Sequence, residues 1–377
     1  MKYFKWIVLF FLLLAGRMAV AQSSQNVIAD LNKLFSYLHK EKMFNGAVGV
    51  RYKGKTIFEH GYGTGNFETR SAFTPASQTE LASVSKQFTA TAIMLLWKDG
   101  KLRLNDNINA YFDPKLPYEG ITIKDLLTHQ SGLPRYTPFF KKGWDPQKVA
   151  TNEDIVRLLR KYHPPVFFSP GSHYRYSNLG YILLAQIVKK VSGERLDHFL
   201  TRHVFVPFGM SATGFYPRFA IFRMPLYAPG MIWSKDSGKY VRPEYFGNRK
   251  YVWYLSGRFG SGRLTSSVND LLTWDSLLYT NSILPQAIIR KMFVPQVSIP
   301  GESASYGFGW KIDSADHSIV FHKGSWPGNY TYIKRFTRER STVVILNNTY
   351  SKYMKAIRNT TDAIVKGEPW HYPEKKE

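Results

Sequence analysis

The chain has 377 residues, which is enough for one large domain or two ordinary ones. Hydrophobic residues make up 44% and charged residues 21%, proportions that are typical of globular proteins and exclude a disordered chain. The net charge of +24 favours anionic partners, and the absence of cysteine excludes disulfides, a cysteine nucleophile and thiolate metal ligands.

The first residues are typical of a secretory signal peptide. Lys2 and Lys5 form a basic start, residues 7–15 are apolar, and Ala19 and Ala21 mark a small-x-small cleavage site. We therefore expect residues 1–21 to be a signal peptide and the mature protein to act in the periplasm or outside the cell. A retained anchor is the alternative, but the apolar run is short for a bilayer, so no stable membrane span is expected after cleavage.

The basic residues are spread along the chain. Losing Lys2, Lys5 and Arg17 with the signal peptide would lower the net charge from +24 to +21. In an exported protein, anionic cell-envelope components are the partners that this charge favours. A nucleic-acid partner is not expected, because the basic residues form no long run and no recognisable nucleic-acid motif. A basic surface without a specific partner is the simpler explanation of the scattered charge.

The predicted elements begin with an amphipathic helix, because apolar residues recur at helical spacing between residues 27 and 38. Two strands follow at residues 46–52 and 56–62, and a Lys-Gly-Lys turn joins them. Residues 83–98 are predicted to form a helix that Gly100 closes.

The middle of the chain is predicted to be mostly helix and loop, from about residue 105 to residue 215. The clearest helices there are at residues 151–162 and 179–191. Residues 216–260 are rich in aromatic residues, proline and glycine and are predicted to form loops. The aromatic stretch from Tyr240 to Phe259 either lines a substrate groove or packs in the core.

The last third of the chain returns to strands. A helix is predicted at residues 268–279, strands at 318–322, 330–336 and 341–346, and a final helix at 350–365.

Strands at both ends of the chain, with helices inserted between them, indicate an α+β fold. We expect one antiparallel β-sheet flanked by helices, with a mostly helical subdomain inserted at about 105–215. No internal repeat or low-complexity linker is present, so residues 22–377 are predicted to form a single domain.

Ser83-Val-Ser-Lys86 offers a nucleophile and a base for acyl transfer. Residues i and i+3 share one face of a helix, so the amine of Lys86 can reach Ser83 Oγ. A lysine crowded into such a site can lose its proton near neutral pH. The pattern is weak by itself, because an N-capping serine followed by a solvated lysine has the same spacing.

Tyr176-Ser-Asn178 offers a second base. A tyrosine beside an ammonium group can ionise below its usual pKa, and Asn178 can bind a substrate amide and orient a lysine. The structural alternative for Tyr176 is a half-buried tyrosine ahead of a helix. The same pattern recurs at Tyr279-Thr-Asn281, where its position at a helix end fits a cap better.

His322-Lys-Gly-Ser325 follows an apolar strand. His322 can donate to a carboxylate or a carbonyl, and Gly324 would let a substrate approach the strand edge closely. An ordinary strand end with a satisfied histidine is the alternative. The ten histidines lack metal-ligand spacings such as H-E-x-x-H, so no metal and no cofactor is expected.

In this order the three patterns resemble the three motifs of class C β-lactamases, DD-peptidases and related esterases, and class A enzymes carry S-D-N and K-T-G in the later places. Segments at residues 126–133, 260–266 and 306–310 resemble further parts of the same family, and the resemblance covers roughly residues 27–365. It implies a penicillin-binding-protein-like serine hydrolase with a β-lactamase/transpeptidase-like fold.

The resemblance also implies roles for single residues. Ser83 would be the nucleophile, Lys86 its partner, and Tyr176 would share the general-base role. Asn178 would orient Lys86 and the substrate. The backbone N–H groups of Ser83 and Ser325 would form the oxyanion hole.

One departure bears on the substrate. β-Lactamases of this type usually carry Lys-Thr-Gly at the third motif, whereas this chain has His322-Lys323-Gly324. Neighbouring strand residues face opposite ways, so Lys323 cannot replace His322. The resemblance therefore leans towards the H-x-G branch, and it implies an ester, an amide or a D-amino-acid peptide as the small-molecule or peptide substrate.

Two alternatives stay open beside this hypothesis. The first is a DD-carboxypeptidase or a β-lactamase proper on the same machinery. The second is a catalytically silent envelope protein that binds peptidoglycan fragments.

Overall fold

The computed structural model describes residues 23–141, 144–246 and 250–375, so the predicted signal peptide at 1–21 lies outside the described residues. The first described element is a helix over residues 23–40. Its apolar face is buried, as the helical spacing predicts, and includes Leu31 and Phe35.

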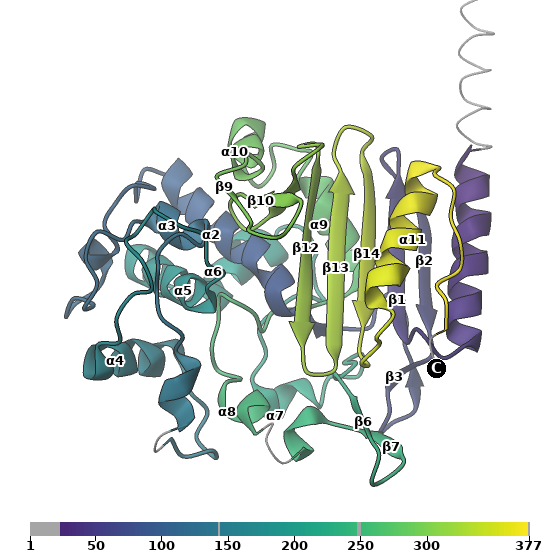
Figure 1. The fold of residues 1–377 in the computed structure, drawn as a ribbon, viewed down its shortest axis with the longest axis horizontal. Helices are drawn as coiled ribbons and strands as arrows, with labels where there is room; N and C mark the ends of the chain where they lie inside the picture. Colours follow the sequence, from purple (N-terminus) through teal and green to yellow (C-terminus); the bar gives the residue numbers. More distant parts are fainter. Residues whose placement is uncertain (1–22, 142–143, 247–249, 376–377) are drawn as a thin grey trace, which may run out of the picture.

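An eight-stranded antiparallel sheet forms the centre of the molecule (Figure 1). Its first and last strands in the sequence lie side by side, with Val48 of one opposite Ile345 of the other. The strands, in spatial order, are β2 (Lys55–Tyr62), β1 (Gly46–Tyr52), β14 (Ser341–Asn347), β13 (Asn329–Phe336), β12 (Ile319–Trp326), β11 (Lys311–Asp313), β10 (Ala304–Tyr306) and β9 (Val297–Ser298).

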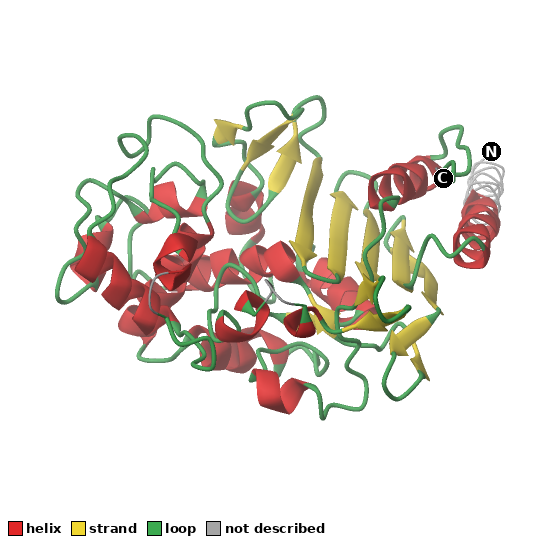
Figure 2. Ribbon diagram, turned by 60° about the horizontal axis from the view of Figure 1, so that its bottom comes forward, coloured by secondary structure: helices red, strands yellow, loops and turns green. Residues whose placement is uncertain are grey.

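Helices cover both faces of the sheet because its central strands alternate between two apolar clusters (Figure 2). Val343 and Ile345 pack with the helix at residues 23–40 and with α11 (Met354–Lys366). Val344 and Leu346 point to the other face and share a cluster with α9 (Val268–Leu277).

The helical part lies on the β12 side of the sheet, away from β1 and β2 (Figure 1). Its two central helices are α2 and α5, which pack against each other in the larger apolar cluster. The helices are α2 (Lys86–Lys98), α3 (Ile123–Leu127), α4 (Asn152–Tyr162), α5 (Asn178–Ser192), α6 (Leu196–Leu200) and α10 (Gln286–Met292).

Local sequence explains where two of these helices begin. Thr151 and Asp154 form a capping box at the start of α4, and the hydroxyl of Ser177 accepts from the N–H of Gly180 at the start of α5. The two helices predicted at 151–162 and 179–191 are therefore found within one residue of their expected starts.

The segment from 216 to 260 contains short elements as well as the predicted loops. They are α7 (Arg218–Ile221), β6 (Ile232–Ser234), β7 (Lys239–Val241) and α8 (Tyr251–Tyr254). Two further two-stranded sheets pair β3 (Thr64–Asn66) with β4 (Ser71–Ala72) and β5 (Thr79–Glu80) with β8 (Thr265–Ser266).

The α+β prediction of an antiparallel sheet flanked by helices is confirmed. Two predicted boundaries are wrong: the final helix begins at Met354 rather than at residue 350, and the strand predicted at 318–322 continues to Trp326. Within the described ranges, no helix is long and apolar enough to cross a bilayer.

Candidate active site

Ser83 lies in a short 3₁₀ turn, η1 (Ala82–Ser85), immediately before α2. The predicted single helix at 83–98 is thus divided into two elements. Ala82 adopts φ 48°, a left-handed conformation that is uncommon for a residue with a Cβ and is typical of functional turns. Leu81 stands at the N-cap position and no side chain caps the turn, so Ser83 is not a capping serine.

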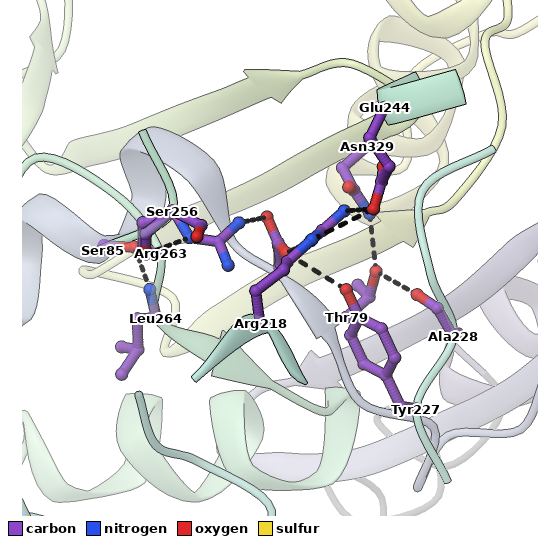
Figure 3. A network of polar contacts seen from close by, with 11 residues as sticks. Thr79, Ser85, Arg218, Tyr227, Ala228, Glu244, Ser256, Arg263, Leu264 and Asn329 are labelled. Atoms are coloured by element: carbon purple, nitrogen blue, oxygen red, sulfur yellow. Dashed lines mark hydrogen bonds and ion pairs between the residues drawn. The ribbon is translucent and has the colours of Figure 1, made fainter. Parts of the chain in front are cut away.

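A buried ion cluster holds the strand that leads into this turn (Figure 3). Glu80 of β5 forms ion pairs with Arg218 at 2.6 Å and with Arg263, and it accepts a hydrogen bond from Tyr227 at 3.1 Å. Burial alone would raise the pKa of Glu80, but Arg263 and Arg218 outweigh it and hold that pKa below its usual value. The cluster therefore fixes the backbone three residues ahead of Ser83.

Lys86 is completely buried and has three oxygen partners. Its Nζ lies 3.2 Å from Ser83 Oγ, 2.9 Å from Asn178 Oδ1 and 2.7 Å from the carbonyl oxygen of Ser261. None of the three partners is a carboxylate. The solvated lysine that the structural alternative required is therefore excluded.

The surroundings of Lys86 favour the neutral amine. Burial lowers the pKa of Lys86 well below its usual value, and the positive charge of Arg258 adds to this effect. Arg258 is itself buried and donates hydrogen bonds to the hydroxyls of Tyr136 at 2.7 Å and Ser261 at 3.2 Å.

The side chains of Tyr176 and Asn178, at the start of α5, both approach the amine of Lys86. The ammonium position of Lys86 lies 4.8 Å from the centre of the Tyr176 ring. Tyr176 is 38% exposed and also lies against the buried ring of His129, with 4.3 Å between the ring centres. Desolvation of the hydroxyl raises the pKa of Tyr176, and a hydrogen bond with Ser83 opposes this only in part. The expected ionisation of Tyr176 below its usual pKa is therefore wrong.

His322 lies on β12 and is buried. Its Nδ1 lies 2.9 Å from the carbonyl oxygen of Lys323, which can only accept, so Nδ1 carries the proton. Burial lowers the pKa of His322 well below its usual value. The neutral ring therefore accepts from the hydroxyl of Tyr306 at Nε2, at 3.0 Å, and it presents no N–H to a substrate.

Gly324 allows β12 to lie close to the turn that carries Ser83. A Cβ at this position would lie 2.2 Å from the carbonyl oxygen of Leu81 and 2.2 Å from Thr331 Oγ1. The hydroxyl of Thr331 also donates to that carbonyl at 2.6 Å. The expectation that Gly324 makes room for substrate is thus replaced by a role in seating the turn that carries Ser83 against β12.

Lys323 and Ser325 lie on the opposite side of β12 from His322 and Gly324, as the alternation along the strand predicts. Beyond Phe321 this strand has no β11 partner, because their pairing ends at Lys311 opposite Phe321. That edge of β12 is therefore open next to Ser83.

A cavity of about 770 Å³ opens on this edge. Its wall includes the sequence-predicted residues Ser83, Tyr176, His322, Gly324 and Ser325. The structure thus brings together residues from η1, the start of α5 and β12, and Asn178 joins them through Lys86.

A second cavity of about 600 Å³ adjoins the first through Ser325, Tyr330 and Tyr350. Tyr240 and Tyr251, from the aromatic stretch that the sequence singled out, line it. The other Tyr-x-Asn pattern lies elsewhere, and Asn281 there accepts from the N–H of Gln286 at 2.9 Å, which is the cap-like role expected for it.

Several residues of the site carry no pattern of their own. Ser261 contributes only its carbonyl oxygen, and Arg258 and Tyr306 act through buried contacts. His129 packs beneath Tyr176 and accepts from the N–H of Ser177 at 3.1 Å. Three of them, His129, Ser261 and Tyr306, lie in the extra segments noted above, which was the only signal that could have found them. In the described part of the chain, no group of three His, Asp or Glu side chains is placed to hold a metal ion.

A family model described as beta-lactamase matches residues 26–365. A penicillin-binding protein of Bacillus subtilis is 36% identical over 356 residues, which cover 93% of this chain and 79% of the relative. A D-aminopeptidase of Brucella anthropi is 29% identical over 285 residues, covering 75% of this chain but only 52% of the relative, so the chain spans about half of that protein.

Solved structures agree in fold. The octameric penicillin-binding protein homologue of Pyrococcus abyssi has a TM-score of 0.77 at 28% identity, covering 90% of this chain and 78% of that one. The penicillin-binding protein of Bacillus halodurans has a TM-score of 0.76 at 25% identity, covering 86% of this chain and 98% of that one.

Proposed function

The chain belongs to the beta-lactamase family of serine hydrolases, which act by acyl transfer, and from this premise we propose that Ser83 is its acylated nucleophile, with an amide, a D-amino-acid peptide or an ester as substrate. The observation that carries the proposal is the set of partners of Lys86. Two of the three are oxygens that can only accept, and the third is Ser83 Oγ.

This arrangement aims the lone pair of a neutral Lys86 at the nucleophile. An uncharged amine has two N–H groups, which the oxygens of Asn178 and Ser261 occupy. The remaining lone pair then faces Ser83 Oγ at 3.2 Å and accepts its proton. Lys86 is therefore the general base in this proposal, and its depressed pKa keeps the base form available near neutral pH.

The reaction then proceeds in two halves. Ser83 Oγ attacks the substrate carbonyl as its proton passes to Lys86, and the backbone N–H groups of Ser83 and Ser325 stabilise the oxyanion. Tyr176 stays protonated because its pKa is raised, so it donates its proton to the leaving group and regains one from Lys86. Water then attacks the acyl-enzyme and returns Ser83 to its free state.

Asn178 and His322 take different parts. The Oδ1 of Asn178 is occupied by Lys86, so its Nδ2 is the atom available to a substrate amide. His322 is a positioning residue, since it holds Tyr306 and the Lys323 carbonyl rather than the substrate.

An amide or peptide substrate is supported by the D-aminopeptidase among the relatives, and an ester by the H-x-G third motif. The β-lactamase alternative is weaker, because Lys323 lies across β12 from His322 and no lysine occupies the usual place of that motif. Parallel assays of D- and L-alanine p-nitroanilide, a short-chain p-nitrophenyl ester and nitrocefin test the choice. We expect the D-anilide or the ester to be turned over and nitrocefin to be poor. If nitrocefin has the highest kcat/KM of these substrates, the β-lactamase alternative is favoured instead.

Export belongs to the same proposal. We propose that residues 1–21 are removed and that the protein acts in the periplasm or outside the cell, where anionic envelope components surround it. The exported protein should begin at Gln22. N-terminal sequencing of secreted or periplasmic material checks this, and recovery of residues 1–21 on that material would refute it.

A further inference from the structure

His129 comes just after the short helix α3 and combines two unfavourable features. Its backbone adopts φ 62°, a left-handed conformation that is most often taken by glycine where a helix ends. Its Nε2 is buried and has no hydrogen-bond partner among the described residues. Backbone strain and an unpaired buried polar atom both cost free energy, and both are typical of functional sites. Glycine would avoid both costs, which indicates that the side chain of His129 has a use.

Both of the backbone N–H groups that flank Tyr176 are held by His129. The carbonyl oxygen of His129 accepts from the N–H of Arg175 at 2.8 Å, and its Nδ1 accepts from the N–H of Ser177 at 3.1 Å. Residues 174–177 belong to no helix or strand. The position of this segment therefore depends on such contacts, and His129 supplies one on each side of Tyr176.

The ring of His129 also packs against the ring of Tyr176, with 4.3 Å between the ring centres. Two buried tyrosines enclose the imidazole further, since the ring centre of Tyr306 lies 4.5 Å away and that of Tyr181 lies 5.2 Å away. A side chain that is packed in this way has little freedom to turn. His129 therefore fixes Tyr176 both through the backbone and through its ring.

The hydrogen bond with Ser177 requires one protonation state of His129. A backbone N–H can only donate, so Nδ1 must be unprotonated and the proton of the neutral ring must be on Nε2. Burial lowers the pKa of His129 well below its usual value, which keeps the ring neutral. The Nδ1 acceptor is therefore present at neutral pH.

We propose that His129 is a positioning residue for Tyr176, because its Nδ1 and its carbonyl oxygen hold the chain where the Tyr176 hydroxyl can reach the leaving group. The inference rests on the proposed function, in which Tyr176 donates a proton to that group. Such a donor must lie within hydrogen-bond reach of the leaving atom. A displacement of about 1 Å can lower the rate by about 10²-fold.

Esters of one acid with two different alcohols separate this role from general damage to the fold. A p-nitrophenyl ester releases a stabilised anion that needs no proton, whereas an ethyl ester needs a proton donor. The readout is the ratio of the ethyl to the p-nitrophenyl kcat/KM on the mature protein, since kcat/KM includes the release of the alcohol. Tyr176→Phe should lower this ratio, and a loss of stability alone should leave it unchanged.

Three variants of His129 test the Nδ1 acceptor. His129→Phe keeps a ring but has no acceptor, and it should lower the ratio by about tenfold or more. His129→Asn tolerates the left-handed conformation and places Oδ1 near the position of Nδ1, so its ratio should stay near that of the unaltered protein. His129→Ala lacks both ring and acceptor and should lower the ratio as His129→Phe does. The Asn and Ala variants both lack the ring, so this pair decides the question even if His129→Phe does not fold.

Tyr332→Phe is the structural control. It removes a buried hydroxyl that donates to Asp362 at 2.8 Å, in the apolar cluster on the other face of the sheet. Its thermal midpoint should fall while the ratio stays unchanged. The double variant His129→Phe/Tyr176→Phe should have the ratio of Tyr176→Phe alone, because no hydroxyl remains to be positioned.

The inference is overturned if His129→Phe keeps the ratio of the unaltered protein, if the Asn and Ala variants lower it equally, or if the double variant lowers it further than Tyr176→Phe. In each of these cases the proposed function stands as long as Tyr176→Phe lowers the ratio and hydrolysis depends on Ser83. If Tyr176→Phe leaves the ratio unchanged, the donor role of Tyr176 fails and the inference fails with it. Hydrolysis that persists in Ser83→Ala refutes the proposed function itself.

Discussion

Lys86 has three neutral partners and no carboxylate, which decides how Ser83 is activated. A buried ammonium without a counter-ion is unfavourable, so the free energy of the site favours the amine. Arg258 strengthens this preference because it places a second positive charge nearby. Burial and the positive charge of Arg258 therefore keep Lys86 in the form that can accept a proton.

Replacing Arg258 by methionine should move the acid limb of the kcat/KM–pH profile to higher pH. With one positive charge removed, the pKa of Lys86 rises towards its ordinary value, and activity is lost as pH falls through that pKa. The measurement is kcat/KM against pH for a neutral ester. Arg258→Lys keeps a charge and is the control. An acid limb that stays in place in Arg258→Met would show that Arg258 has only a structural role.

Lys86 and Tyr176 should behave as one unit. Lys86→Ala removes the base and Tyr176→Phe removes only a hydroxyl, and each should lower kcat/KM by about 10²–10⁴-fold. The double variant should be little worse than the poorer single variant, because groups that act together are not additive. Multiplied losses in the double variant would mean that the two residues act independently.

At the scale of elements, the contact between β12 and η1 sets the position of the nucleophile. Gly324→Ala should force them apart, since its Cβ would lie 2.2 Å from the Leu81 carbonyl oxygen. We expect Gly324→Ala to lower the free energy of unfolding by about 1–3 kcal/mol. It should also lower kcat, because Ser83 is moved away from its productive position. Gly262→Ala is the control, because its Cβ would meet nothing closer than 3.6 Å. Equal effects of the two substitutions on kcat, measured beside urea unfolding, would contradict this role.

Removing the charge of Glu80 should lower the free energy of unfolding more than removing an exposed carboxylate does. Glu80→Gln leaves Arg263 buried without its acidic partner and should lower the free energy of unfolding by about 3–5 kcal/mol. Glu153→Gln, which breaks an exposed pair with Lys189, should cost about 0–1 kcal/mol. Urea denaturation of both variants is the measurement.

The pH dependence of that stability gives a second check. The folded state holds the pKa of Glu80 below its usual value, so its contribution is complete above that ordinary value of 4.5 and is lost as pH falls through the folded pKa. The unaltered protein should therefore lose more stability on acidification below pH 4.5 than Glu80→Gln does. Parallel losses would show that Glu80 is not held ionised by Arg218 and Arg263.

Elements with a clear period were predictable from the sequence. The strands β1, β13 and β14 alternate between two buried faces, and α4 has a capping box and one apolar side, so each was found within a few residues. The two- and three-residue strands β9 and β11 are too short to show a period. They exist because neighbouring strands pair with them.

At the scale of the whole molecule, the sheet and the helical part meet at the site. η1, the start of α5 and β12 are about 90 to 240 residues apart in the chain. Asn178 becomes a neighbour of Lys86 because α2 and α5 pack together, whereas Ser83 reaches Lys86 through local structure. The three motifs were recognisable by their order, but the Ser261 carbonyl was not, because any residue has one. The sequence indicated that Lys86 can be neutral, but it did not predict the raised pKa of Tyr176, which follows from desolvation of its hydroxyl in the folded site.

The most direct test is intact-mass analysis of the mature protein after treatment with a fluorophosphonate, beside the thermal midpoint of each variant. The unaltered protein should gain the mass of one adduct, and Ser83→Ala should gain none while its midpoint stays nearly unchanged, because Ser83 caps no helix. Ser85→Ala is the matched control and should still be labelled, although its buried hydroxyl accepts from Leu264 and its loss lowers the midpoint. A folded Ser83→Ala protein that still takes up one adduct or still hydrolyses substrate would contradict the assignment of Ser83 as the nucleophile.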